Sequence, residues 1–248
     1  MKTVCLISGG LDSAVAGAIA RSQGYEVHAL TFDYGQRHSI EVECARKITK
    51  WLDSEHKIFN IDMNQIGGSA LTDEIEIPEG KSIDEIRNSN EIPPTYVPAR
   101  NTIFLSIALA YAEVIGAEAI FIGAHAVDYS GYPDCRPEYF EEFRRLAKLA
   151  TKQGVEGKGI GIETPLIELS KADIIKKGSE LGVPFEHTWS CYKGGTCPCC
   201  CEKLKRGEFE LKEVINKGCD SCLFRNDGFR ELGVIDPLLL RLRNEGII

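Results

Sequence analysis

Short apolar runs alternate with helical patterns from residue 1 to about residue 185, and this alternation most constrains the fold. The predicted strands are residues 4–8, 27–32, 57–61 and 119–122. The predicted helices are residues 14–22, 38–52, 100–115, 138–151 and 171–181. Strands that alternate with helices form a parallel sheet covered on both faces. The sequence therefore predicts an α/β protein with a doubly wound parallel sheet, whose ligand site lies beyond the carboxyl ends of the strands.

Two stretches depart from this alternation. Residues 67–98 are polar, contain Pro78, Pro93 and Pro94, and lack a sustained period, so they are predicted to form a long loop over the site. Residues 186–248 hold a cysteine cluster followed by two short helical patterns. The chain is thus predicted to have a main domain at residues 1–185 and a small metal-braced subdomain at residues 186–248.

The hexamer from Ser8 to Ser13, SGGLDS, sits between the first predicted strand and the first helix. Its two glycines allow a sharp turn that brings backbone N–H groups close to an anion, and the helix N-terminus adds partial positive charge. Ser8 and Ser13 offer hydroxyl donors, whereas Asp12 would repel phosphate and is better suited to hold Mg²⁺. The competing interpretation is a plain turn with Asp12 or Ser13 as the helix N-cap.

Composition excludes several classes of protein. The formal net charge is −8 and no basic run is present, which argues against direct nucleic-acid binding. The first ten residues, MKTVCLISGG, are too short in their apolar part for a signal peptide or a membrane span, and are typical of a first strand. A cytoplasmic location is expected.

The ten cysteines of the chain point to a metal rather than to disulfides. Seven of them lie between Cys191 and Cys222, and no secretion signal accompanies them. Cys197 with Cys200 and Cys219 with Cys222 are two-spaced pairs separated by eighteen residues, a spacing typical of a zinc ribbon. With four thiolates the zinc site would be closed, and one structural Zn²⁺ per chain is expected.

Several segments carry a resemblance to a known family. The hexamer at residues 8–13 resembles the phosphate loop of the ATP pyrophosphatase (PP-loop) superfamily. The segments at residues 33–38, 97–105, 123–138, 163–166 and 228–237 resemble the 7-cyano-7-deazaguanine synthase family. This resemblance implies a Rossmann-like fold of the adenine nucleotide alpha hydrolase type, with a zinc-binding C-terminal appendage.

The resemblance also implies an activity. Members of this family convert 7-carboxy-7-deazaguanine, ammonia and ATP to 7-cyano-7-deazaguanine, a precursor of queuosine or archaeosine, through adenylated carboxylate and amide intermediates. The implied enzyme is a ligase that forms carbon–nitrogen bonds. Its partners are these small molecules, with no direct nucleic acid and no membrane, and a homodimer is compatible with the sequence.

Candidate site residues follow from the loop, the strand ends and the resemblance. The expected nucleotide-binding residues are Ile7, Ser8, Gly9, Gly10, Leu11, Asp12, Ser13, Ala14, Asp33 and Tyr34. The expected substrate-binding residues are Asp128, Tyr129, Ser130 and Asp134, since a carboxylate suits an exocyclic amine; the alternative for either aspartate is local turn chemistry. The expected catalytic residues are Asp12, Ser13 and Arg100. A cation at a helix start hints at an anionic partner, although Arg100 could instead point to solvent.

Three lone residues are interpreted as structural. His38 is expected at the surface and His125 at a strand end, while Cys135 is expected to be a buried thiol rather than a nucleophile.

The family pattern predicts a different zinc ligand set from the ribbon spacing. It uses Cys191, Cys219 and Cys222, but Asn216 occupies the place of the remaining family cysteine. An insertion at about residues 196–218 would supply the replacement from among Cys197, Cys199, Cys200 and Cys201. The ribbon spacing instead selects Cys197, Cys200, Cys219 and Cys222.

Two rival functions remain on the sequence alone. A tRNA thiolation enzyme of the same superfamily would need an RNA-binding surface and a persulfide-carrying cysteine. A non-enzymatic zinc-containing regulator would leave the SGGLDS loop unexplained.

Overall fold

The computed structural model describes residues 1–36, 39–77, 83–87, 89, 91–125, 131–192 and 219–245. Its centre is a parallel sheet in the order β3-β2-β1-β4-β5. The strands are β1 (Lys2–Leu6), β2 (Glu26–Asp33), β3 (Glu55–Asn60), β4 (Ala119–Phe121) and β5 (Gly161–Glu163). This order reverses at β1, so the crevice between the carboxyl ends of β1 and β4 is where a ligand is expected. The predicted α/β class with a parallel sheet is confirmed.

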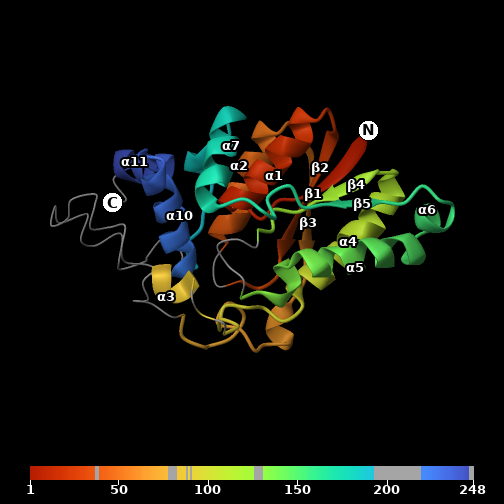
Figure 1. The fold of residues 1–248 in the computed structure, drawn as a ribbon, viewed down its shortest axis with the longest axis horizontal. Coiled ribbons are helices and arrows are strands. Elements are labelled where there is room, and N and C mark those ends of the chain that lie inside the picture. The colour runs from red at the N-terminus through yellow and green to blue at the C-terminus, as the bar shows by residue number, and fades with distance from the viewer. Residues whose placement is uncertain are drawn as a thin grey trace.

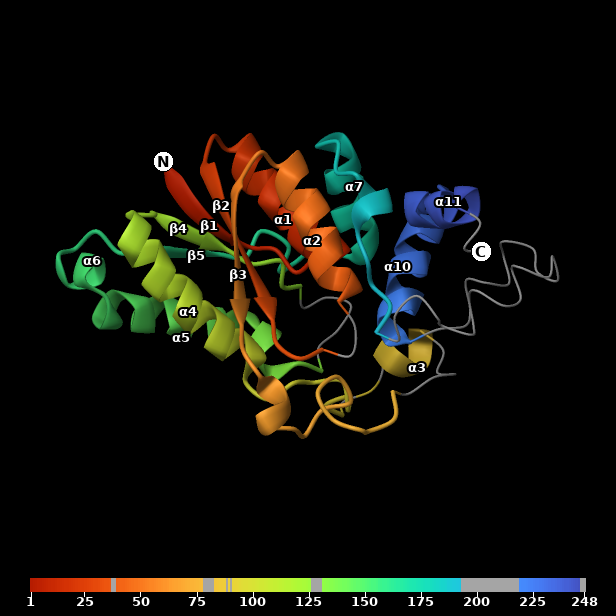
Figure 2. The same ribbon diagram turned by 180° about the vertical axis from the view of Figure 1, so that it is seen from behind.

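Helices cover both faces of the sheet (Figures 1 and 2). One face carries α1 (Leu11–Ser22), α2 (Ile40–Trp51) and α7 (Lys171–Glu180). The other carries α4 (Arg100–Ile115) and α5 (Pro137–Ala150), and the short α6 (Lys152–Val155) follows α5 without burying a residue of its own. Each face has its own apolar core, as the two-sided burial of parallel strands requires.

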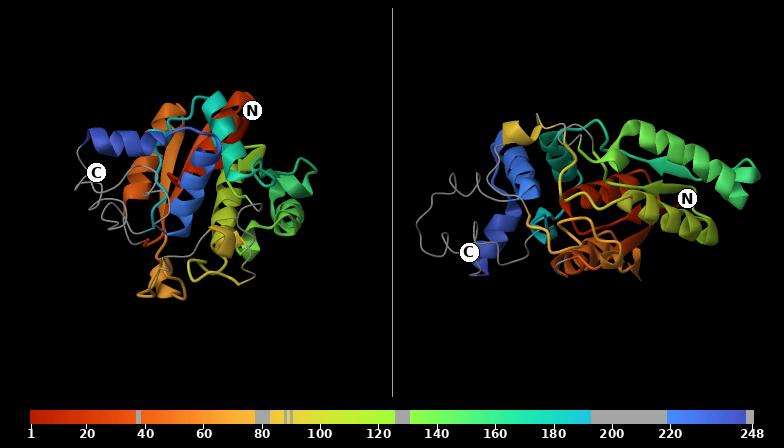
Figure 3. Two further views of the ribbon diagram at one scale, coloured as in Figure 1. Left: turned by 60° about the vertical axis from the view of Figure 1, so that its left-hand side comes forward. Right: turned by 90° about the horizontal axis from the view of Figure 1, so that it is seen from below.

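The remaining elements lie around the carboxyl ends of the strands. They are η1 (Met63–Gln65), α3 (Ile83–Arg87), η2 (Pro133–Cys135), η3 (Phe185–His187), α10 (Asp220–Glu231) and α11 (Pro237–Asn244). Helices α10 and α11 lie at the end of the molecule opposite α6 (Figures 1 and 3). Helix α3, from the predicted long loop, packs its Ile86 against Leu223 and Phe224 of α10.

Helix α10 packs tightly on α7. A Cβ at Gly228 would lie 2.7 Å from Lys171 Cγ and 2.8 Å from Ile175 Cδ1, so the two helices approach closely only because this residue is glycine. Phe229 belongs to the same core cluster as α1 and α7. The predicted subdomain at residues 186–248 thus shares part of its core with residues 1–185, and the boundary itself stays a prediction. Within the described part of the chain, no helix is long and apolar enough to cross a membrane.

Candidate active site

The SGGLDS loop forms a compact turn between β1 and α1. The Ser8 N–H donates to Ser13 Oγ over 3.1 Å, and Ser13 Oγ donates to the Gly10 carbonyl over 3.0 Å. Gly10 is the N-cap of α1, so the alternative of an Asp12 or Ser13 cap is wrong. Gly9 has φ +88°, and a Cβ there would lie 2.1 Å from the carbonyl oxygen of Glu41, so this position admits only glycine. The loop is therefore wedged against the first turn of α2.

Asp12 is held by two basic side chains from distant parts of the chain. Lys171 Nζ lies 2.7 Å from Asp12 Oδ1 and 3.0 Å from His125 Nε2, and His125 Nε2 lies 3.6 Å from Asp12 Oδ2. Burial alone would raise the pKa of Asp12, but the Lys171 ammonium and the His125 ring outweigh it and hold that pKa below its ordinary range. Asp12 is thus a carboxylate that orients a buried ammonium group beside the phosphate loop.

Lys171 was not predicted from the sequence, although one signal was available. It is the first residue of α7, directly after the Ser170 N-cap, where the helix dipole disfavours a cation. The capping box formed by Ser170 and Asp173 fixes that helix start. Lys171 is only 7% exposed. A buried lysine at a helix N-terminus needs an anionic partner, and Asp12 is that partner.

A cavity of about 230 Å³ opens beside the phosphate loop, at the ends of β1, β2 and β4. Of the predicted nucleotide-binding residues, those that line it are Ile7, Ser8, Gly10, Leu11, Asp12, Ser13 and Tyr34. Gly9 is packed against α2, and Ala14 and Asp33 are not among the lining residues. Phe32 and Phe104 stack with their ring centroids 4.0 Å apart and form one apolar wall.

A second cavity of about 100 Å³ adjoins the first and contains the basic cluster. Leu11, Asp12, Ser190, Tyr192 and Ser221 line both cavities. Lys171 and His125 line only the second. The phosphate loop therefore stands between a larger cavity with one apolar wall and a smaller one that holds the paired Lys171 and Asp12 side chains.

Arg100 begins α4 and lines the larger cavity instead of pointing to solvent. Burial alone would lower the pKa of its guanidinium, but the Tyr34 and Tyr132 phenols outweigh burial and raise it, so Arg100 stays a cation. The helix start is held by Asp134, whose Oδ2 accepts from the Asn101 N–H over 2.9 Å. This bond gives Asp134 a structural role, and its contact with substrate stays a prediction.

Some of the other predicted site residues lie outside the part of the chain that the structure describes. Asp128, Tyr129 and Ser130 lie outside the described residues, as do Cys197 and Cys200 and the lone His38. Cys135 is buried, and burial raises the pKa of its thiol to about 12, which fits the expected structural thiol and not a nucleophile.

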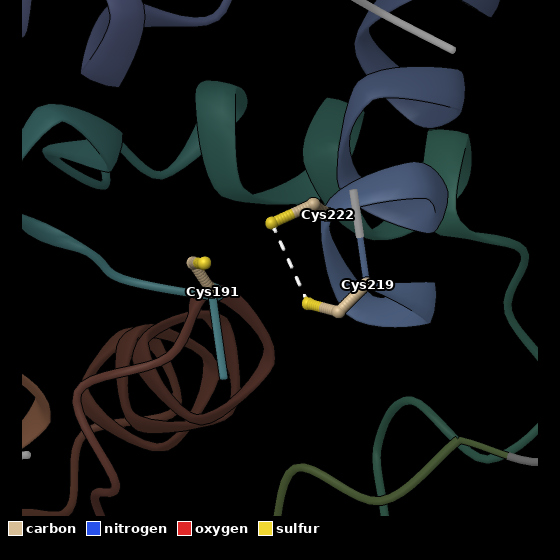
Figure 4. A group of neighbouring side chains, drawn as sticks. All are labelled: Cys191, Cys219 and Cys222. Carbon is tan, nitrogen blue, oxygen red and sulfur yellow. Dashed lines mark hydrogen bonds between the residues drawn. The ribbon is translucent and has the colours of Figure 1, made fainter. Parts of the chain in front are cut away.

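Cys191, Cys219 and Cys222 converge beside the cavity (Figure 4). Their three Sγ atoms lie within 4.8 Å of one another. Hydrogen bonds among the three thiols lower the pKa of Cys219 and raise that of Cys222, so Cys219 is the thiol of this pair most readily deprotonated for a metal. Three clustered thiols fit Zn²⁺, and the presence of Cys191 among them favours the ligand set predicted by the family pattern. The fourth ligand would come from outside the described residues.

The cluster of three thiols is connected to the phosphate loop through Trp189. The Trp189 N–H donates to the Gly9 carbonyl, and its Nε1–H donates to the Cys191 carbonyl, each over 2.9 Å. Arg225 of α10 supports the same segment by donating to Thr188 Oγ1 over 2.7 Å and by pairing with the buried Asp236. A metal at the thiols would therefore also brace the wall of the active site.

Asp12→Asn is expected to leave the fold intact and to lower ATP turnover by at least about 100-fold, roughly 2.7 kcal/mol of transition-state stabilisation. The amide keeps the shape of the side chain but loses the charge that orients Lys171 and that would hold a magnesium ion. Circular dichroism checks the fold, and release of pyrophosphate measures the rate. A near-normal rate would remove Asp12 from the mechanism.

The chain is similar to several known proteins. The family model for "Queuosine biosynthesis protein QueC" matches residues 2–233. A protein of Thermoplasma acidophilum named 7-cyano-7-deazaguanine synthase is 54% identical over 96% of this chain and 91% of its own length. A protein of the same name from Desulfatibacillum aliphaticivorans is 53% identical over 95% of this chain and 95% of its own length. A solved NMN synthetase from Francisella tularensis covers 99% of this chain and 82% of its own, with a TM-score of 0.42 at 15% identity.

Proposed function

The chain belongs to the QueC family of queuosine biosynthesis proteins, and from this premise we propose that it is a carbon–nitrogen ligase that makes 7-cyano-7-deazaguanine. Its substrates are 7-carboxy-7-deazaguanine, ammonia and ATP. The observation that carries the proposal is the junction of the two cavities, where the phosphate loop and the Asp12–Lys171 pair meet the larger cavity that Arg100 lines. This junction lies at the switch point of the sheet, where nucleotides bind in such folds.

The chemistry explains why ATP is needed. A carboxylate is a poor electrophile because its leaving group would be oxide. Its oxygen attacks the α-phosphorus of ATP, pyrophosphate leaves, and an acyl adenylate forms. Ammonia then displaces AMP to give the amide. A second adenylation, now at the amide oxygen, followed by loss of AMP and a proton, gives the nitrile.

The residues of the site match these steps. Lys171 offers positive charge to the departing pyrophosphate from the smaller cavity, and Asp12 orients that ammonium group. Ser8, Ser13 and the loop N–H groups bind the phosphates that remain over the loop. Arg100 lies where it can pair with the carboxylate of the base. The apolar wall of Phe32 and Phe104 suits a planar base.

Two metal ions belong to this proposal. Mg²⁺ is commonly held by one or two carboxylates together with substrate phosphates, and Asp12 is the carboxylate that the phosphate loop offers. When bound, Mg²⁺ would add positive charge to the phosphates, alongside Lys171. Zn²⁺ would be held by Cys191, Cys219, Cys222 and one further cysteine, a closed site with a structural role. The reaction is expected to take place in the cytoplasm, without direct nucleic-acid or membrane contact.

The product and the cleavage pattern of ATP test the function. The protein is incubated with the base, ammonium and ATP. We expect mass spectrometry to detect the nitrile and chromatography to find AMP and pyrophosphate. In a parallel reaction supplied with tRNA and a sulfur donor, a sulfur-containing tRNA would support the thiolation enzyme, and unchanged ATP in both reactions would support the regulator. If ATP gave only ADP and phosphate, the adenylation scheme would be wrong.

A further inference from the structure

Glu41 is a carboxylate that the phosphate-loop mechanism does not use, and it faces the larger cavity. It lies in the first turn of α2 and lines the same cavity as Tyr34 and Arg100. Its backbone is fixed, because the Glu41 carbonyl oxygen packs against Gly9. Glu41 is therefore held at a set position relative to the phosphate loop, as a substrate-binding residue must be.

The Glu41 carboxylate has no hydrogen bond and no ion pair with any other described residue. Burial raises its pKa to about 7, and the nearby Arg100 only partly offsets this effect, while Cys219 adds to it. A carboxyl group in such a place lacks the N–H donors that would favour its ionised form. Glu41 is partly buried at the cavity, so its carboxylate is open to a ligand that supplies hydrogen-bond donors.

Glu41 and Arg100 together present a specific pattern to a ligand. A carboxylate offers two acceptor oxygens, and a guanidinium beside it offers donors. The pyrimidine edge of a guanine-type base carries the complementary groups in order: the 2-amino group and N1–H as donors, then the C6 oxygen as acceptor. A carboxyl group at C7 projects on the same side of the ring system as the C6 oxygen, within reach of the same cation.

We propose that Glu41 recognises the N1–H and 2-amino groups of the base, while Arg100 binds the C6 oxygen and the neighbouring carboxylate. The proposal rests on the proposed function, and it assigns to Glu41 the contact with the exocyclic amine that the sequence suggested for Asp128 or Asp134. It makes Glu41 the residue that selects bases with a 2-amino group. It also explains why α2 packs directly on the phosphate loop, since that contact sets where the base lies relative to ATP.

Glu41→Gln tests this assignment, with Glu43→Gln as the matched control. Both variants replace a carboxyl group in the first turn of α2 with an amide, but Glu43 is exposed and pairs with Arg46 at the surface. Binding of 7-carboxy-7-deazaguanine, and of its analogue without the 2-amino group, is measured by calorimetry. Steady-state kinetics give KM for the base and for ATP, and circular dichroism checks folding.

The wild-type protein is expected to bind the base about 100-fold more tightly than the analogue, since a site built around a polar group rejects a ligand that lacks it. Glu41→Gln is expected to weaken binding of the base by about 100-fold and to bind base and analogue within about fivefold of each other. KM for ATP should change by less than about twofold, and Glu43→Gln should behave as the wild type.

Other outcomes overturn the assignment in distinguishable ways. Unchanged binding of the base by Glu41→Gln would exclude Glu41 from recognition. A rise in KM for ATP with unchanged binding of the base would place Glu41 at the nucleotide instead. If the wild-type protein neither binds the base nor forms the nitrile, the proposed function fails together with this inference. If it forms the nitrile while Glu41→Gln still discriminates against the analogue, only the assignment of Glu41 fails.

Discussion

Lys171→Met is expected to lower kcat for the adenylation step by about 1,000-fold. Loss of one preorganised donor to developing charge costs about 10²–10³ in rate. Here the change also leaves the Asp12 carboxylate without its 2.7 Å partner, so a negative charge remains beside the phosphates. Methionine keeps most of the length and apolar contact of the lysine stem, which packs near Gly228. Pyrophosphate release under saturating ATP measures the effect.

The design separates charge from packing. Lys177→Met, on the same helix but at a surface pair with Glu180, is the control and should retain nearly full activity. The double variant Asp12→Asn/Lys171→Met should lose much less than the product of the two single losses, because the two side chains form one pair. Such non-additivity is expected for residues in direct contact. The pair would not act as a unit if the loss of rate in the double variant equalled the product of the two single losses. A near-normal rate for Lys171→Met would show the same.

The fold was largely predictable because its strongest signals are local. The predicted helix at residues 100–115 has the bounds of α4, since Pro98 precedes it, Gly116 ends it in a left-handed conformation, and it is apolar along its length. Strand β5 was missed. It has only three residues and begins with Gly161, so its extended form depends on pairing with β4 rather than on its own sequence.

The site was less predictable, because its contacts join distant segments. The phosphate loop is contiguous in the sequence, so its residues could be identified from a motif of six residues. Lys171 lies 159 positions from Asp12, and nothing in either segment specifies the other. Glu41 reads as an ordinary acidic residue in the first turn of a helix, where it complements the dipole. Only the packing of Gly9 against α2 brings it to the cavity.

Cys191→Ser is expected to abolish zinc binding, reducing the metal content from about one ion per chain to less than about a tenth, because a closed structural site needs all four thiolates. Cys44→Ser, which alters a buried thiol in α2 outside the cluster, is the control and should keep its zinc. Plasma emission on purified protein measures the metal. Full zinc retention in Cys191→Ser, with loss in Cys197→Ser or Cys200→Ser, would instead support the ligand set predicted from the ribbon spacing.

Loss of zinc should also weaken ATP binding, although a closed zinc site does not activate water. Metal binding contributes directly to folding, so its loss should loosen the segment that carries Cys191. Trp189 lies in that segment and donates to the Gly9 carbonyl, so the phosphate loop would lose a bond that holds its backbone. We therefore expect the zinc-free Cys191→Ser protein to show KM for ATP raised by about tenfold, the effect of about 1.4 kcal/mol of lost binding. A zinc-free protein with unchanged KM for ATP would show that the thiol cluster supports α10 alone.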